Sequence, residues 1–329
     1  MYKDSLLQIR FTPKERLEGR NMYNMSQEEK EYLAQYDIAK YDRPSIAADM
    51  AVFSVMGNRA EETVRDTENY RKLPEKKLKI LLIQRESYPY KERWALPGGF
   101  CLKGEEVCEA ARRELFEETQ VTDAYLQLAG VFGEEGRDPR GWIISHTFLA
   151  LIDGEKYRVR GGSDAWDARW FEVDLEKEKS VEEQEKDSVM KKTTYRLRLT
   201  NRDKEEPIVL NAVVREERSI HNFQVKTDYY IEDEQGFAFD HAKLIVYALL
   251  KLRQQTETDG RIVFDLMPEY FTLTELQNVS EIILGKELLT ANFRRKMSDY
   301  VLETNRMITG AGHRPAKLFK RSLQSIFPE

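Results

Sequence analysis

The chain of 329 residues has little cysteine, little proline and no long apolar run. Two cysteines are too few for a disulfide scaffold, and 17 glycines with 10 prolines exclude collagen-like and low-complexity classes. No apolar run approaches the roughly 18 residues that a membrane-spanning helix needs. The first residues, Met1–Ser5, contain no signal-peptide apolar core. We therefore expect a cytoplasmic protein with no membrane segment.

The chain has enough apolar residues to form hydrophobic cores, since 41% of it is hydrophobic. At roughly 150 residues per domain, the length suggests about two domains. The formal net charge of −6 does not by itself indicate a nucleic-acid partner, but the charge is unevenly distributed. From Lys286 to Arg321, nine basic residues stand against three acidic ones, so this segment carries +6 within an acidic chain.

Hydrophobic periodicity predicts alternating strands and helices. Short apolar runs predict buried strands, and apolar residues at helical spacing predict a helix over Glu105–Thr119 and a second over Asp240–Gln255. The strands expected are Ala48–Met56, Leu78–Ile83, Gln127–Phe132, Ile143–Ile152 and Ala168–Val173. Residues 1–44 are polar, with a helical patch at Glu28–Tyr36, and are interpreted as an N-terminal arm packed on the domain that begins after it.

The middle of the chain is highly charged. Seven acidic and three basic residues lie between Asp174 and Asp187, and we interpret 174–192 as a solvated helix or a flexible excursion. The strands expected after it, as an inserted hairpin or small sheet, are Tyr195–Thr200, Ile208–Arg215 and Gln224–Ile231. Residues 256–260 are expected to be a linker before a last unit of roughly 65 residues.

An unusual set of charges lies on the first predicted helix. Glu114 and Glu118 are four residues apart and Glu114 and Glu117 three, so their carboxylates converge on one flank of the helix. Their mutual repulsion costs helix stability, and a divalent cation offsets that cost. Hard carboxylate oxygens on a rigid helix suit Mg²⁺, and the Gly98-Gly99 turn allows a backbone carbonyl to join them. The alternative is a set of merely solvated surface acids.

The spacing of these residues is more specific than a set of solvated surface acids would need. Gly99 is followed after five residues by Glu105, and after seven more by Arg113 and Glu114. With Glu117 and Glu118, this arrangement resembles the Nudix box, a glycine–glutamate–arginine–glutamate pattern on a loop, a helix and a loop. Gln120 stands where the family has the glycine that ends the helix in a left-handed conformation, which should cost about 1 kcal/mol.

The resemblance to Nudix proteins implies a site and an activity. Glu114, Glu117 and Glu118 would hold Mg²⁺, or Mn²⁺ as an alternative, with the Gly98 carbonyl nearby. Arg113 would orient the carboxylates, and Glu105 would brace the loop. The implied reaction is hydrolysis of a nucleoside diphosphate derivative. Glu134 or Glu135 is the candidate for the base that positions the water, and the alternative reading of both is simple loop acids.

The stretch Gly136–Gly141 resembles the ADP-ribose-type subgroup of Nudix proteins. Arg137 and Arg140 would bind phosphate or ribose oxygens through charge-assisted hydrogen bonds; the alternative is an Asp-Pro turn with two solvated arginines. Asp167–Phe171 and Phe239–Ala242 also fit this subgroup. His241, within the second of these, is expected to make a structural or capping contact.

The last unit has the order of a winged helix-turn-helix. Thr272 with Glu275 forms a capping box, and Gly285 ends the first helix. A second, basic helix begins near Thr290, and a hairpin comes after it with strands at Val301–Thr304 and Ala316–Lys320 around a turn at 310–312. The expected DNA-binding residues are Arg294, Arg295, Lys296, Arg314 and Lys317. The alternative is a small domain that packs on the enzyme or mediates dimers.

The sequence therefore predicts an α/β protein: a Nudix α/β/α sandwich with a mixed sheet, and a small C-terminal winged helix-turn-helix domain. The predicted divisions are an arm at 1–44, a Nudix domain at 45–255 with an insertion at about 173–237, and a winged-helix unit at 261–329. This combination resembles the Nudix-related transcriptional regulators of NAD metabolism, from which a homodimer is expected.

Two functions are indicated by these features and are compatible with each other. The first is Mg²⁺-dependent cleavage of ADP-ribose or a related derivative, with binding of double-stranded DNA by the C-terminal unit. The alternative is a regulator whose Nudix domain senses such a ligand without significant turnover. A third reading, an inactive scaffold, requires Gln120 to disable the end of the helix.

Overall fold

A computed structural model gives the structure of the chain. It describes residues 25–322 except 58–75, 123, 155, 158–164, 186–187, 204–205, 222–223 and 309–314. Within these residues no helix is both long and apolar enough to cross a membrane.

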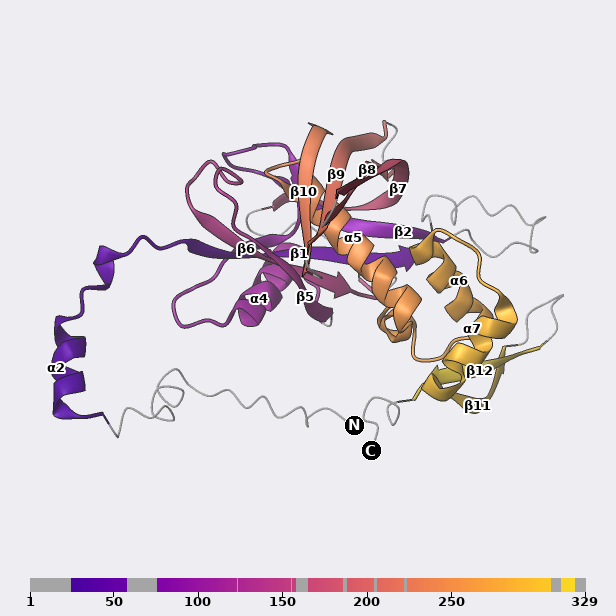
Figure 1. The fold of residues 1–329 in the computed structure, drawn as a ribbon. Helices are drawn as coiled ribbons and strands as arrows, with labels where there is room; N and C mark the ends of the chain where they lie inside the picture. Colours follow the sequence, from indigo (N-terminus) through magenta and orange to yellow (C-terminus); the bar gives the residue numbers. More distant parts are fainter. Residues whose placement is uncertain are drawn as a thin grey trace.

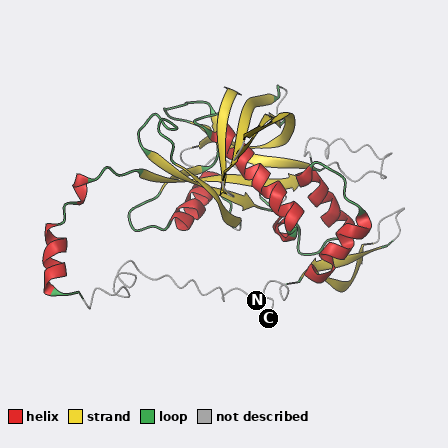
Figure 2. Cartoon of the chain, viewed as in Figure 1, coloured by secondary structure: helices red, strands yellow, loops and turns green. Residues whose placement is uncertain are grey.

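A ten-stranded mixed sheet forms the centre of the molecule (Figures 1 and 2). Its main path runs in the order β10-β9-β8-β7-β2-β1-β6-β5, with β3 beside β2 and β4 beside β1. Only the β1–β6 pair of that path is parallel. In chain order the strands are β1 (Ser45–Met56), β2 (Lys77–Arg85), β3 (Trp94–Ala95), β4 (Gly98–Phe100), β5 (Tyr125–Phe132), β6 (Ile143–Leu151), β7 (Ala165–Glu185), β8 (Ser188–Asn201), β9 (Ile208–His221) and β10 (Gln224–Gln235).

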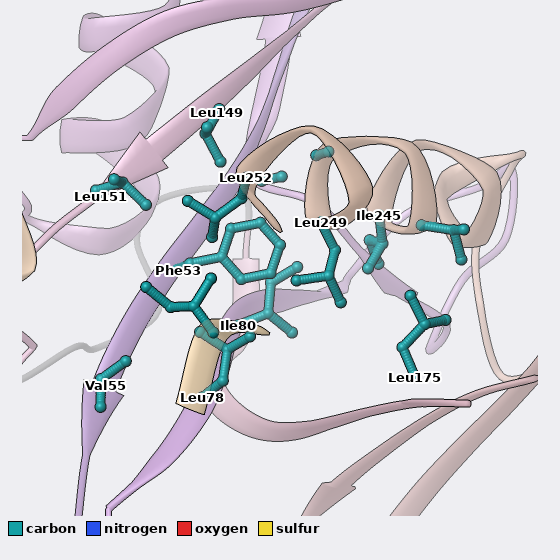
Figure 3. Close-up of a cluster of buried hydrophobic side chains, with 14 of the residues drawn as sticks. Phe53, Val55, Leu78, Ile80, Leu149, Leu151, Leu175, Ile245, Leu249 and Leu252 are labelled. Carbon is teal, nitrogen blue, oxygen red and sulfur yellow. The ribbon is translucent and has the colours of Figure 1, made fainter. Parts of the chain in front are cut away.

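Two helices cover opposite faces of this sheet. Side chains of a strand alternate between the faces, and β1 is buried on both. Ala48, Met50 and Val52 pack in the cluster that contains Ala110, Ala111 and Leu115 of α4 (Val107–Thr119). Ala51, Phe53 and Val55 pack in the cluster that contains the apolar face of α5 (His241–Thr258), which Figure 3 shows around Phe53 and Leu249. The expected α/β/α sandwich is confirmed.

The charged middle of the chain is β structure, so its interpretation as a helix or flexible excursion is wrong. β7 runs through Asp174–Glu185 and pairs with β8 along most of its length. Cross-strand ion pairs such as Glu178–Arg196 and Glu183–Lys192 compensate the charges. The strands expected after this run lie within β8, β9 and β10, which extend the central sheet and do not form a small separate one.

The C-terminal unit contains the expected helices and hairpin. After η3 (Arg261–Leu266), α6 (Leu273–Leu284) begins at a Thr272–Glu275 capping box and ends at Gly285. The basic helix α7 (Thr290–Met297) comes next, then η4 (Ser298–Tyr300) and the hairpin of β11 (Val301–Ile308) and β12 (Ala316–Arg321). The expected turn at 310–312 lies outside the described residues.

No extended linker separates this unit from the sheet. α5 continues to Thr258, and η3 begins at Arg261 with Val263 and Phe264 buried. Leu276 and Ile283 of α6 belong to the same buried cluster as Phe53 of β1. The expectation of a linker at 256–260 is therefore wrong, because one hydrophobic core runs through both parts.

The N-terminal arm is described only from residue 25. Its helix α2 (Gln27–Gln35) lies within one residue of the expected patch, but it buries none of its residues and stands apart from the sheet in Figure 1. The expectation that this helix packs on the rest of the chain is therefore wrong. The helix is held instead by a local capping box between Ser26 and Glu29.

Candidate functional site

Arg113, near the middle of α4, organises the acidic cluster. Its guanidinium donates to Glu105 Oε1 at 2.8 Å and Oε2 at 2.9 Å, to Glu114 Oε1 at 2.7 Å and to Glu117 Oε2 at 3.1 Å. It also donates to the Phe100 carbonyl oxygen at 3.1 Å. The hydrogen bonds from Arg113 lower the pKa of Glu105. Glu105 also accepts the Leu102 N–H at 2.9 Å, so it ties the loop to the helix.

Two of the glutamates lie against the Gly98-Gly99 turn. Glu118 is buried and accepts the Gly98 N–H at 2.8 Å. A Cβ on Gly99 would lie 2.3 Å from Glu114 Oε1, so a larger residue there would require this carboxylate to move. Burial raises the pKa of Glu114, although Arg113 opposes the change. Because the loop packs on the helix without side chains between them, the backbone at Gly98 and these carboxylates are neighbours.

The donor set fits a hard divalent cation in its chemistry. Glu114, Glu117 and Glu118 offer carboxylate oxygens on one helical ridge, the ligands that Mg²⁺ prefers. Arg113 binds one oxygen each of Glu114 and Glu117. Nowhere in the described ranges are three acidic, histidine or cysteine side chains gathered as a ready metal cage. The carboxylates of Glu114 and Glu117 each keep a second oxygen to which Arg113 does not donate.

A small cavity of about 100 Å³ opens beside the same turn. Gly98, Gly99 and Phe100 form part of its wall. The titratable groups in the wall come from four segments of the chain and are Asp49, Arg85, Arg137, Asp138, Arg140 and His241. The Nudix-box loop is thus shared between the glutamate ridge and a pocket rich in arginine.

The structure places Arg137 and Arg140 at this cavity, but both have partners within the protein. The Arg137 guanidinium donates to Asp240 Oδ1 at 2.7 Å and Oδ2 at 3.1 Å, and its side chain is only 5% exposed. Arg140 donates to Asp138 Oδ2 at 2.7 Å and lies between the rings of Phe100 and Phe239. Arg137 is buried and therefore not the solvated turn residue of the alternative, whereas the side chain of Arg140 is 40% exposed and pairs within its own turn. A role of either residue in ligand binding stays a prediction.

The start of α5 closes the cavity from the other side. His241 Nδ1 accepts the Leu96 N–H at 2.9 Å, which leaves the proton on Nε2, 3.9 Å from Asp49 Oδ1. Burial lowers the pKa of His241, so the ring is neutral. Asp49 also accepts a short hydrogen bond from the Ser145 hydroxyl. The contact of His241 is therefore structural, as expected.

The two candidate bases lie in the loop that follows β5. Glu134 forms a close ion pair with Lys243 of α5, whose ammonium also lies 3.1 Å from Asp240 Oδ2. Glu135 is exposed. A base role for either residue stays a prediction, and the pairing of Glu134 makes it less available than its neighbour.

Of the expected DNA-binding residues, Arg294 and Arg295 are exposed on α7. Lys296 donates to the Glu257 carbonyl oxygen at 2.8 Å, at the end of α5. Lys317 pairs with Glu303 across the hairpin. Arg314 lies outside the described residues.

Sequence reasoning did not assign roles to Asp49, Arg85 and Asp240, which the structure brings to the cavity or its rim. Phe239 and Asp240 belong to a stretch that the subgroup resemblance had marked, so a signal existed for them. Arg85 ends a buried strand, and a cation at a strand end beside the box was the signal for it. Asp49 lies within an apolar strand and gave no comparable sign.

Comparison with known proteins supports both parts of the chain. Residues 73–192 match the model of the NUDIX domain, and residues 263–320 match the model of the NrtR DNA-binding winged helix domain. The ADPR responsive transcriptional repressor NtrR of Acinetobacter baylyi is 30% identical over 90% of this chain and 89% of its own length. The ADP-ribose pyrophosphatase of Methanocaldococcus jannaschii is 46% identical over 30% of this chain and 57% of its own length.

Two solved structures share the fold of most of the chain. A MutT/nudix family protein from Enterococcus faecalis superposes with a TM-score of 0.57 at 23% identity, over 91% of this chain and 99% of that one. Shewanella oneidensis NrtR superposes with a TM-score of 0.51 at 23% identity, over 84% of this chain and 94% of that one. At these identities the likeness extends to the fold alone.

Proposed function

Because the chain belongs to the family of Nudix-related transcriptional regulators, which joins a Nudix domain to an NrtR winged helix domain, we propose that it is a DNA-binding regulator responsive to ADP-ribose or a related nucleoside diphosphate derivative. One observation carries the proposal: the cavity beside the Nudix-box loop is lined by three arginines, and α5 connects it to the winged-helix unit. Charge-assisted hydrogen bonds from arginine are the usual means of binding phosphates.

The DNA-binding surface would be centred on α7. Arg294 and Arg295 are exposed on it, and a second helix of a winged helix-turn-helix enters the major groove. Shewanella oneidensis NrtR has been crystallised with a 27mer DNA. By analogy we assign double-stranded DNA as the partner, a homodimer as the binding unit and the cytoplasm as the compartment.

Selection from a pool of random duplexes, followed by anisotropy titration of the selected duplex, tests this function. We expect binding that weakens as salt rises, as phosphate contacts require, and that weakens again when ADP-ribose is added. Combined Arg294→Ala and Arg295→Ala changes should reduce affinity at least tenfold. An exposed-surface control, Lys191→Ala on β8, should bind as the unaltered protein does. Failure to select any duplex would count against the proposal. So would a selected duplex whose binding does not change when ADP-ribose is added.

A second candidate function is hydrolysis of the same ligand. It is favoured by the intact set of Arg113, Glu105 and the three helix glutamates, and by the similarity to an ADP-ribose pyrophosphatase. When bound, Mg²⁺ would neutralise the diphosphate and lower the pKa of a water molecule. Arg113 and Glu105 would keep the loop and the carboxylates in place, and Glu135 or Glu134 would accept the proton of the water.

Incubation with ADP-ribose, Mg²⁺ and water tests the second candidate, because cleavage gives AMP and ribose 5-phosphate. We expect AMP release that falls at least 100-fold in Glu118→Gln. The matched control is Glu109→Gln on the same helix, which keeps a capping side chain and lies off the ridge. Equal AMP in all three samples would exclude hydrolysis at this site but leave ligand sensing untouched.

A further inference from the structure

The outermost strand at one end of the sheet has an unpaired edge. β10 pairs with β9 on one side, and in the described part of the chain no strand lies along its other side (Figure 1). Its register with β9 is unbroken from Gln224 to Ile231, and a shift comes after it, between Ile231 and Asp233. The backbone N–H and C=O groups along such an edge are a template for another strand.

The opposite edge of the sheet is protected. β5 carries a shift in register between Leu128 and Gly130. The carbonyl oxygen of Ala129, which lies between them, accepts hydrogen bonds from Tyr247 and Lys251 of α5 at 3.1 and 2.6 Å. Bulges and covering side chains are usual ways of blocking a free edge. Among the described residues no side chain forms a hydrogen bond with the backbone of β10, so β10 is the edge that is open to pairing.

The charges on β10 complement a second copy of the same strand. Lys226 and Asp228 are two residues apart, so they lie on one face of the strand, and their side chains form an ion pair at 2.8 Å. When two copies pair antiparallel with Thr227 opposite Thr227, each Lys226 lies opposite Asp228 of the other copy. Neither charge then directly faces a like charge, and opposite charges across a strand pair are stabilising.

Exposed apolar side chains lie along the same stretch. Val225 is 52% exposed and Tyr230 is 43% exposed. Ile220, the β9 residue opposite Val225, is 39% exposed. In the register given above, Val225 lies opposite Tyr229 of the second copy, and a β-branched residue opposite an aromatic one is a stabilising cross-strand pair. Pairing would therefore cover apolar surface that the single chain leaves in water.

We propose that β10 is the dimerisation strand of this protein. It pairs antiparallel with β10 of a second copy over Gln224–Tyr230, with Thr227 at the two-fold axis. One sheet then runs through both subunits, and the contact is isologous, as a closed dimer requires. The inference deepens the proposed function, in which the binding unit is a homodimer. The competing view is that Lys226 and Asp228 keep the edge in water, as charges on edge strands often do.

Sedimentation equilibrium of the full chain over a range of concentrations separates these views. The proteins are the unaltered chain, Lys226→Asp, Asp228→Lys, a double variant that carries both changes, and an equimolar mixture of the two single variants. The control Val131→Lys places a charge at an exposed position of β5, on the opposite edge of the sheet. A thermal melt of each protein, followed by circular dichroism, reports on folding.

We expect the unaltered chain to be a dimer. Each single variant should dimerise about tenfold more weakly or worse, because like charges then face each other across the axis. The double variant should regain the affinity, since it exchanges the two charges and keeps them complementary. The equimolar mixture should form a heterodimer, because one variant supplies two negative charges and the other supplies two positive ones. Val131→Lys should dimerise as the unaltered chain does.

Dimers of unchanged strength in both single variants would overturn this inference alone and leave the homodimer standing. A mixture that stays monomeric would also overturn it, because a mere folding defect in each variant explains that result. Loss of the dimer in Val131→Lys alone would assign the contact to β5. If the unaltered chain is a monomer, the inference and the homodimer of the proposed function both fail, whereas the selection of a duplex and its response to ADP-ribose still test DNA binding.

Discussion

At the scale of single residues, Asp240 joins two buried cations. Its carboxylate accepts hydrogen bonds from Nε and Nη2 of Arg137, and the Lys243 ammonium lies 3.1 Å away. All three side chains are nearly buried. Burial by itself would raise the pKa of Asp240, but the attraction of Arg137 and Lys243 outweighs it and holds that pKa below the ordinary value.

Replacing Asp240 by Asn should destabilise the protein by about 3 kcal/mol at pH 7, because buried Arg137 loses its counter-charge and Lys243 loses one of its two carboxylate partners. Since the folded pKa is depressed, this contribution is complete above the ordinary aspartate value of 3.8 and is lost as the pH falls through the folded value. Urea unfolding of both proteins between pH 7 and pH 3 measures the difference. It should shrink only at the acid end of that range.

The exposed Asp233 on β10 provides the matched control for this change. Asp233→Asn should alter the free energy of unfolding by less than about 0.5 kcal/mol at any of these pH values. A loss in Asp240→Asn that is independent of pH would mean that packing, and not charge, explains the effect.

The sequence alone predicted only some of the residues that lie at the candidate site. The box spacing led to Arg113, Glu105 and the turn at Gly98-Gly99, because local chemistry on one helix and one loop fixes their neighbourhood. The pairing of Arg137 with Asp240 joins residues 103 positions apart. No local pattern encodes such a contact, so an arginine expected at a phosphate was found in an ion pair.

At the scale of elements, the end of α4 stores strain. Gln120 has φ 63° and ψ 17°, the left-handed conformation that glycine adopts most easily. This agrees with the expectation drawn from the missing box glycine. The side chain recovers part of the cost, since its Nε2 donates to the Phe116 carbonyl oxygen at 3.1 Å.

Gln120→Gly should therefore stabilise the protein by about 0.5 to 1 kcal/mol, the conformational cost removed less the hydrogen bond lost. Gln120→Ala keeps the strained conformation and loses the bond, so it should be less stable than the unaltered chain. Chemical denaturation of the three proteins gives the order. Equal stability of the Gly and Ala variants would show that the backbone at this position is not strained.

The charged segment 174–192 shows why a strand can be mistaken for a solvated helix or a flexible excursion. Seven acidic residues over a short stretch favour a solvated interpretation, and nothing local in them specifies a strand. The strand forms because Arg196 and Lys192 on β8 face Glu178 and Glu183 across the ladder. Cross-strand partners 9 and 18 residues away stabilise the strand here.

At the scale of the whole molecule, the two matched regions share one core. The buried cluster that begins at Phe53 and runs beneath α5 continues to Ile283 and Met297. Arg253 of α5 adds a polar tie, since its Nε donates to the Ile283 carbonyl oxygen at 3.0 Å. The sheet and the winged-helix unit are therefore expected to unfold together.

Leu252→Ala tests this cooperativity, because Leu252 is fully buried in the shared cluster. We expect a loss of about 3 kcal/mol, with a single calorimetric transition and parallel losses of amide protection in β1 and α6. Leu128→Ala, at a half-exposed position of β5, should cost less than about 1 kcal/mol. Two separated transitions in the unaltered chain would contradict a common core.

α5 spans the distance between the cavity and the winged-helix unit. Asp240 stands before its first turn at the cavity, and Glu257 in its last turn receives Lys286 and, through its carbonyl oxygen, Lys296 of α7. These ends lie roughly 27 Å apart on one rigid rod. In the proposed function the ligand weakens DNA binding, and thermodynamic linkage then requires bound DNA to weaken ligand binding by the same factor. A DNA-bound copy would therefore need a higher ligand concentration than a free copy to reach half occupancy.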